Sequence, residues 1–291
     1  MTAGAAAPTA GVAAQAPAVH VPHLRTVYRW ELRKLRSQKR TYLGLGFAIA
    51  MPLLFVLALS VRHGQGPDVA FGHYVRQSGL AIPLVLLIFG SVWLFPLITA
   101  LVAGDIVASE DHNGTLKTIL TRSVDRGKIF VAKAAVAATY AALALVVMGL
   151  VAVAAGGLKS GLHPLTTLSG SRVSVGRGFV LMGATALVYM MPLLTVAAIG
   201  LLLSTVFRNS AGAVVGTLMV SLLMQLITIL PGLGGAGPYL LPEQFNAWQG
   251  LLRTPIDWNP IGHAAWVCAL YAVPSFVTAY LVFLRRDVAG G

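Results

Sequence analysis

The sequence has few charged residues for its length. Only 10% of the 291 residues are Asp, Glu, Lys or Arg and 57% are hydrophobic, whereas a soluble domain has roughly 25% charged residues. The mean hydropathy is +0.79. A chain this poor in charge cannot cover a core with polar surface, so we expect lipid to be its solvent. The composition predicts a membrane protein.

Cysteine and the common catalytic motifs are equally scarce. The single cysteine, Cys268, cannot form a disulfide within the chain, and the seven histidines are scattered without Cys or acidic partners at metal-ligand spacing. The sequence contains no His-Glu-x-x-His, no Gly-x-Ser-x-Gly and no glycine loop that ends in Gly-Lys-Ser/Thr. We therefore predict that the chain is not an enzyme and holds no metal or cofactor itself.

Charge is also absent from the interior of the long apolar runs. A transporter driven by protons or sodium usually needs an ionisable residue within the bilayer, and Lys133 and His263 lie just outside the runs. This disfavours a secondary transporter and an intramembrane enzyme. Ser221, Gln225 and Thr228 are the most polar residues of the fifth run. They are candidates for a transport pathway, and interhelical hydrogen bonds explain them at least equally well.

The apolar runs predict an all-α polytopic protein. About 20 residues of helix cross the roughly 30 Å of hydrocarbon in a bilayer. Residues 22–288 are expected to form a single membrane domain after a disordered, charge-free tail at 1–21 that is rich in Ala, Pro and Gly. The predicted spans lie near 42–61, 80–102, 134–155, 179–206, 213–230 and 264–284.

A basic amphipathic segment precedes the first span. Within 24–40 an apolar stripe falls on one helical face, with basic residues largely around it; the stripe consists of Leu24, Val27, Tyr28, Leu32 and Leu35. Such a helix can lie in the headgroup layer with its stripe at the acyl boundary. We therefore expect an interfacial helix at 24–40.

Basic residues favour one orientation. If the amino terminus is cytoplasmic, fifteen of the 21 Lys and Arg residues lie on the cytoplasmic side, as the positive-inside rule expects. The three basic residues within 159–177 are the main exceptions. We therefore predict that both termini are cytoplasmic. The same placement of charge along the spans argues against nucleic acid as the reason for the net charge of +12.

The segment 109–128, between the second and third spans, is the longest charged loop on the cytoplasmic side. Ser109 is a plausible helix N-cap, with Glu110 and Asp111 in the first turn. Gly114 bends the segment or allows close approach of another surface. Exposed acids and leucines favour a surface for a cytoplasmic partner, and a loop that only caps two spans is the alternative.

This loop resembles that of a known family. The pattern Glu110-x-x-x-Gly114-Thr115-Leu116, followed by Leu120, Thr121, Arg122 and Arg126, is similar to the first cytoplasmic loop of six-helix ABC-transporter export permeases. The end of the chain, Phe283-Leu284-Arg285-Arg286-Asp287, also resembles that family. Ser123 departs from the pattern, because members often carry proline there.

The resemblance implies a function and partners. The chain would be the non-catalytic permease subunit of a bacterial ABC exporter in the cell membrane, moving a drug, peptide, lipid or polysaccharide-like substrate outward. The segment that holds Glu110 would act as a coupling helix in a cleft of a separate ATP-binding subunit, which binds ATP and magnesium. A second permease copy would complete the membrane unit. A membrane anchor or immunity-type protein without transport is the alternative function.

The connection between the fifth and sixth spans is too apolar for a free loop. Within 239–252, Leu241, Phe245, Trp248 and Leu252 recur at helical spacing. Pro242 suits a first helical turn, and Glu243 falls off the apolar face. We predict a short helix that is tucked into the outer leaflet or re-enters from outside, with Trp248 at headgroup level, and that roofs the pathway near its exit. A surface helix that only shields the dimer is the competing explanation.

Overall fold

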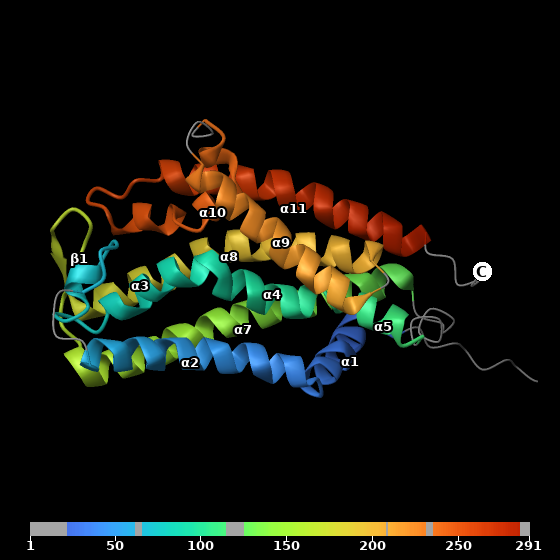
Figure 1. The fold of residues 1–291 in the computed structure, drawn as a ribbon, viewed down its shortest axis with the longest axis horizontal. Coiled ribbons are helices and arrows are strands. Elements are labelled where there is room, and N and C mark those ends of the chain that lie inside the picture. Colours follow the sequence, from blue (N-terminus) through green and yellow to red (C-terminus); the bar gives the residue numbers. More distant parts are fainter. Residues whose placement is uncertain (1–21, 62–65, 115–124, 208, 231–234, 286–291) are drawn as a thin grey trace, which may run out of the picture.

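The helices run along a common axis and form an elongated bundle (Figure 1). The computed structural model describes residues 22–61, 66–114, 125–207, 209–230 and 235–285. A hairpin of two short antiparallel strands, β1 (Leu165–Thr166) and β2 (Arg172–Val173), lies at one end of the bundle. We call this the hairpin end. The opposite end, which carries α1 (Leu24–Arg36) and α5 (Ala108–His112), is the α1 end.

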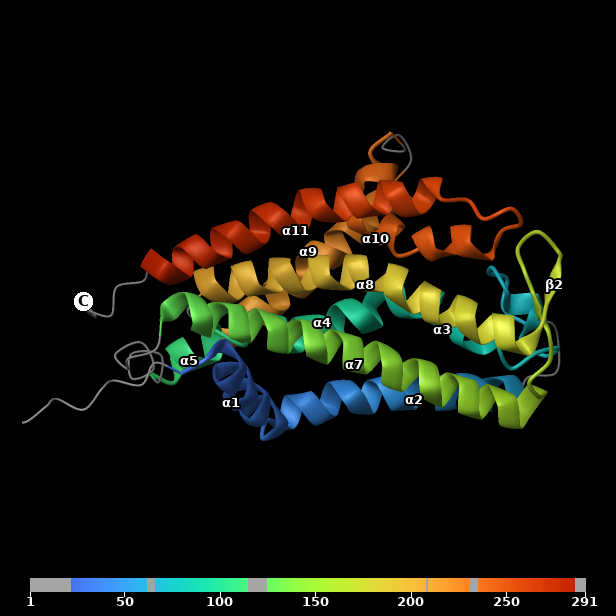
Figure 2. The same ribbon diagram turned by 180° about the vertical axis from the view of Figure 1, so that it is seen from behind.

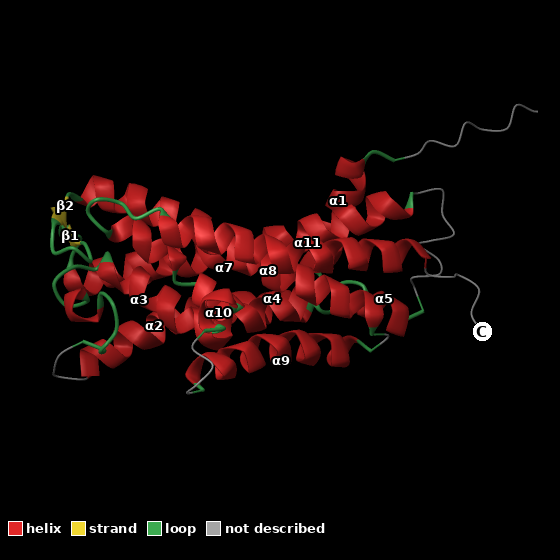
Figure 3. Ribbon diagram, turned by 90° about the horizontal axis from the view of Figure 1, so that it is seen from above, coloured by secondary structure: helices red, strands yellow, loops and turns green. Residues whose placement is uncertain are grey.

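Among the described residues, six stretches of helix are long and apolar enough to cross a membrane, as predicted. The second is built from α3 (Ala81–Phe89), the π-helix η2 (Gly90–Leu94) and α4 (Phe95–Ala103). The other five are α2 (Lys39–Val61), α7 (Arg126–Ser160), α8 (Val175–Val206), α9 (Ser210–Ile229) and α11 (Asn259–Arg285). The all-α fold of the membrane protein is thus confirmed, and Figure 3 shows helix over nearly the whole described chain.

Several helices extend beyond the predicted spans. The 35 residues of α7 give a length of about 52 Å at the usual rise per residue, well over the thickness of the hydrocarbon layer. The helix begins eight residues before the predicted span and ends five residues after it. As a result Lys133, expected just outside the third span, lies within α7 and is fully buried.

The second and fourth spans form the centre of the bundle. Their most apolar windows are 67% and 61% buried, against 17% to 33% for the other four. The outer spans present apolar side chains outward, where lipid or another subunit can cover them. Figure 3 shows α9 along one side of the bundle.

The amphipathic helix α1 lies at a steep angle to α2 (Figures 1 and 2). It ends at Arg36, before the predicted Arg40. Val27 and Leu35 of its apolar stripe are buried within the protein core, and the Tyr28 hydroxyl lies 2.9 Å from that of Thr139 in α7. The expectation that the whole stripe enters the acyl boundary is therefore wrong, because part of it packs inside the protein.

Short helices connect the spans at or near the hairpin end. The 3-10 helix η1 (Gly72–Tyr74) precedes α3, and η3 (Gly237–Tyr239), α10 (Leu241–Gln244) and η4 (Ala247–Leu252) separate α9 from α11. Figure 2 shows α10 and the turn after it between α8 and α11, within the length of the bundle. The connection therefore folds back along the helices instead of standing above them.

Candidate functional site

The helix α5 is fixed to the rest of the bundle by its first turn. The Ser204 hydroxyl of α8 accepts hydrogen bonds from the backbone N–H groups of Val107 and Ala108, each at 3.0 Å. The Ser109 hydroxyl instead donates to the Asp105 carbonyl at 2.8 Å. The prediction of Ser109 as the N-cap is wrong, because a distant serine supplies the acceptor. The start of α5 is thereby anchored to α8.

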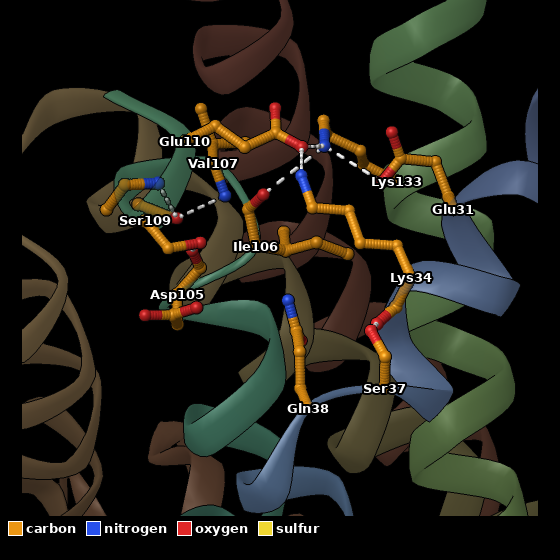
Figure 4. Close-up of polar contacts among 12 residues, drawn as sticks. Glu31, Lys34, Ser37, Gln38, Asp105, Ile106, Val107, Ser109, Glu110 and Lys133 are labelled. Atoms are coloured by element: carbon orange, nitrogen blue, oxygen red, sulfur yellow. Dashed lines mark hydrogen bonds and ion pairs between the residues drawn. The ribbon is translucent and has the colours of Figure 1, made fainter. Parts of the chain in front are cut away.

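Glu110 lies inside the protein. Its side chain is only 2% exposed, so the expectation of an exposed acid is wrong. The Lys133 ammonium of α7 donates to Glu110 Oε1 at 2.5 Å, and the Lys34 ammonium of α1 contacts the same oxygen (Figure 4). One carboxylate of α5 is therefore held between two helices.

Lys133 occupies the centre of this arrangement. In addition to Glu110, its ammonium donates to Glu31 Oε2 at 2.9 Å and lies 3.4 Å from the Ile106 carbonyl oxygen. These three acceptors match the three N–H donors of a lysine. Glu31, Lys34, Glu110 and Lys133, which we call the ionic cluster, contribute two positive and two negative charges from α1, α5 and α7 (Figure 4).

Two opposing effects act on the Glu110 carboxyl. Burial alone would raise its pKa, but the charges and hydrogen bonds of Lys133 and Lys34 outweigh burial and hold the pKa below its ordinary value of 4.5. The carboxylate therefore stays ionised at neutral pH. Removing one partner of a buried ion pair costs about 3–5 kcal/mol, whereas an apolar replacement of the whole pair is often neutral. We therefore expect this cluster to fix the arrangement of its helices more than it adds net stability.

A second charged contact lies nearby. Asp105, at the end of the second span, is buried; the Arg40 guanidinium from the start of α2 pairs with it, and the Ser210 hydroxyl at the start of α9 donates to it. The first, second and fifth spans therefore meet at one carboxylate. The ionic cluster and Asp105 together connect α5 and the chain before it to α1, α2, α7 and α9.

The other predicted coupling residues are placed in part. Asp111 is half-buried beside Glu110. Gly114 has φ +67° and a Cβ there would meet nothing within 4 Å, so it ends the helix through its backbone conformation and not through close packing. Arg126, the first residue of α7, donates to the Leu284 carbonyl at 3.2 Å. Thr115, Leu116, Leu120 and Arg122 lie outside the described residues.

The residues that sequence reasoning missed are Glu31, Lys34, Arg40 and Asp105. Glu31 is the only acid in a strongly basic helix, and Asp105 directly follows an apolar span. An isolated charge of opposite sign at such a position is the signal that could have identified both. Their partners lie far away in sequence, and no local spacing points to them.

The candidate pathway residues lie on α9. The Ser221 hydroxyl donates to the Thr217 carbonyl at 3.2 Å and the Thr228 hydroxyl to the Gln225 carbonyl at 2.6 Å. Within the described part of the chain, none of Ser221, Gln225 and Thr228 hydrogen-bonds to another helix. Within one copy these residues thus bond only inside α9, and their part in a pathway stays a prediction.

The connection between α9 and α11 is a packed element. Pro242 lies in the first turn of α10, as predicted, and Leu241, Phe245, Trp248 and Leu252 are all buried. Phe245 packs edge-on against Tyr189 of α8, with ring centroids 5.1 Å apart, and Trp248 stacks on Phe71 at 6.1 Å. The Trp248 ring is enclosed by protein and therefore does not itself face headgroups, while the depth of this element in the membrane stays a prediction. Glu243 is exposed.

The comparison with protein families agrees with this arrangement. A family described as "ABC-2 family transporter protein" matches residues 28–224, which include most of α1, all of α5 and the spans as far as most of α9. The chain belongs to the ABC-2 transporter family. It is therefore an ABC transporter permease, a multi-pass membrane subunit that does not itself carry out catalysis. Family membership also implies association with an ABC ATP-binding subunit. No curated protein matches the chain.

Proposed function

We propose that this ABC-2 permease is the membrane subunit of an ATP-driven exporter in a bacterial cell membrane. The substrate would be a drug, peptide, lipid or polysaccharide-like molecule taken from the cytoplasm or the inner leaflet. ATP and magnesium would be bound by the partner subunit. Export as the direction of transport rests on the resemblance of the 110–126 loop to export permeases.

The α1 end would face the cytoplasm. The basic helix α1, the start of α7 and the end of α11 all lie there (Figure 1). Positively charged residues are retained on the cytoplasmic side of a membrane. Both termini would then be cytoplasmic and the hairpin end would be extracellular.

The ionic cluster is the observation that best supports a coupling role for α5. A displacement of α5 by an ATP-binding subunit cannot leave α1 and α7 behind without separating buried charges. The Ser204 hydroxyl connects the start of α5 to α8 in the same way. Asp105, just before α5, connects it to the starts of α2 and α9. ATP binding would bias the permease between two conformations because the ATP-binding subunit contacts α5 differently in each.

A second copy of the permease would complete the transport pathway. Along α9 the exposed large apolar residues recur at helical spacing and form one stripe, consisting of Val215, Met219, Leu223 and Leu226. Packing of this stripe against another copy would bury it. This is why we favour a homodimer.

The test is co-expression of the full chain with candidate ABC ATP-binding subunits, followed by purification and an ATP hydrolysis assay. We expect an ATP-binding subunit to remain bound and its hydrolysis to be stimulated by an exported compound among the candidate classes. If no ABC ATP-binding subunit associates with the folded chain, the proposal fails and a membrane anchor without transport becomes the better explanation.

A further inference from the structure

A polar pocket of about 480 Å³ lies where α9 ends, next to α10 and the start of α11. Its walls include Thr228, Glu243, Gln244, Asn246 and His263. Thr228 belongs to the candidate pathway and Glu243 to the predicted outer element, so the structure brings together two sets of residues that are separate in the sequence. The pocket is remote from the ionic cluster at the α1 end.

The side chains of this pocket have already used most of their hydrogen-bond donors. The Gln244 amide nitrogen donates to the Pro238 and Leu240 carbonyls at 2.7 and 2.9 Å, and the Thr228 hydroxyl donates within α9. What remains on these two residues is oxygen, which accepts. The Glu243 carboxylate is acceptor-only and makes no hydrogen bond or ion pair within the described residues. Asn246 retains its amide N–H groups, since Gln249 donates to its oxygen at 3.3 Å.

Both ring nitrogens of His263 lie within hydrogen-bond distance of a neighbouring group. The Trp266 indole N–H can only donate, and it lies 3.3 Å from His263 Nδ1, so this nitrogen accepts. The proton then sits on Nε2, which donates to the Pro238 carbonyl at 2.8 Å. Both ring nitrogens of His263 are thereby engaged, and the Glu243 carboxylate is the acidic group of the pocket.

Aromatic rings flank the pocket on the α11 side. The rings of Tyr239, His263 and Trp266 lie with centroids 5.5 to 5.9 Å apart, and Tyr239 and Trp266 are each about half exposed. A ligand with a cationic head would meet acceptors in the pocket and aromatic surface beside it.

We propose that this pocket is a binding site for the ammonium group of an amphiphilic amine. An ammonium group supplies a positive charge for the Glu243 carboxylate and N–H donors for the free oxygens of Thr228 and Gln244, and the apolar part would lie on the Tyr239 and Trp266 rings. This deepens the proposed export function, since the site would select cationic substrates near the exit of the pathway. It rests on that function only for its place in transport, because binding to the pocket needs no ATP.

The test uses dansylcadaverine, a fluorescent primary amine, and its uncharged N-acetyl derivative as probes. Binding to the full chain in nanodiscs is followed by the change in dansyl fluorescence. We expect the amine to bind more tightly than the N-acetyl compound, and Glu243→Gln to weaken amine binding roughly tenfold, as expected for loss of a charged hydrogen bond. Asp257→Asn is the matched control, because this carboxylate also lies in the connection between α9 and α11 but pairs with Arg253 at 3.5 Å and does not line the pocket.

A second variant, Thr228→Val, removes one acceptor with little change of shape and should weaken the amine but not the N-acetyl compound. Equal affinity of the two probes, or unchanged amine binding in both Glu243→Gln and Thr228→Val, would overturn the proposal. Failure of ATP-driven export with amine binding intact would count against the exporter and leave the site standing. Export that persists without charge-selective binding would count against the binding site and leave the exporter standing.

Discussion

At the residue scale, the environment of Glu110 determines what its substitution can reveal. The carboxylate is buried between Lys34 and Lys133, so Glu110→Gln leaves the two ammonium groups without their shared partner. We expect a loss of stability of about 3–5 kcal/mol, seen as a lower midpoint of thermal unfolding in detergent. The control is Asp111→Asn, at the half-buried neighbouring acid, for which we expect a much smaller shift.

The contrast between the two variants tests the cluster. If Glu110→Gln unfolds at the same temperature as the wild type, the cluster does not hold α1, α5 and α7 together. The pair Glu110→Lys with Lys133→Glu adds a further check, because swapping the charges should recover part of the stability that either single change removes.

The pH dependence of stability follows from the lowered pKa of Glu110. Because the pKa is lower in the folded protein than in the unfolded chain, the ionised carboxylate contributes its full stability above the ordinary value of 4.5. That contribution is lost as the pH falls through the lowered pKa. Thermal unfolding midpoints are measured from pH 7 downward. Below the ordinary pKa of 4.5 they should therefore fall more steeply in the wild type than in Glu110→Gln. Parallel curves would show that Glu110 does not titrate as described.

Much about individual residues could not be predicted from the sequence. Glu110 was singled out from the loop pattern, yet its burial depends on Lys133 and Lys34, which lie 23 and 76 positions away. Burial of charge is a property of tertiary packing, and local spacing contains no information about it. Gly114 is different, because a need for positive φ is a local property and a glycine in a polar loop already suggests it.

At the element scale, the positions of the long helices were predictable because each needs only a continuous apolar run. Their ends were not, because α7 continues for eight residues before the predicted 134 and there carries Lys133 as a buried partner. The short elements α10 and η4 were predicted as a helix from their spacing. Enclosure of Trp248 was missed, since its stacking partner Phe71 comes from a distant connection.

The topology of the elements can be tested by labelling with a membrane-impermeant thiol reagent. Cys268 is buried, and replacing it with serine removes the background. In that variant Ser174→Cys at the exposed start of α8 should react in intact cells, whereas the exposed Asn113→Cys at the α1 end should react only after the cells are opened. Labelling of Asn113→Cys from outside would reverse the orientation.

The element formed by α10 and η4 can be loosened at Phe245. Phe245→Ala removes the edge-on contact with Tyr189 and leaves a cavity, which costs about 3–5 kcal/mol for a buried phenylalanine. We expect the ATP-binding subunit to remain bound, because the change is far from the α1 end, while stimulation of hydrolysis by substrate is lost. Trp258→Ala, at an exposed ring outside the pocket, is the control for loss of aromatic surface alone. Normal stimulation in Phe245→Ala would rule out a role in transport.

At the scale of the whole molecule, the two ends of the bundle differ in charge and construction. The α1 end concentrates basic residues, the ionic cluster and the buried Asp105. The hairpin side has a short sheet, the packed α10 and η4, and the acidic pocket at Glu243. This asymmetry is what we expect of a permease that receives a partner at one end and releases substrate at the other.

Site-specific cross-linking tests this account most directly. A photoreactive amino acid is placed at Asn113 on the α1 end or at Ser174 near the hairpin end, and the chain is co-expressed with its ABC ATP-binding subunit. Our account predicts a cross-link to that subunit from Asn113 and none from Ser174. A cross-link from Ser174, or none from Asn113 while the two proteins still co-purify, would contradict the assignment of the α1 end as the surface that couples ATP hydrolysis to transport.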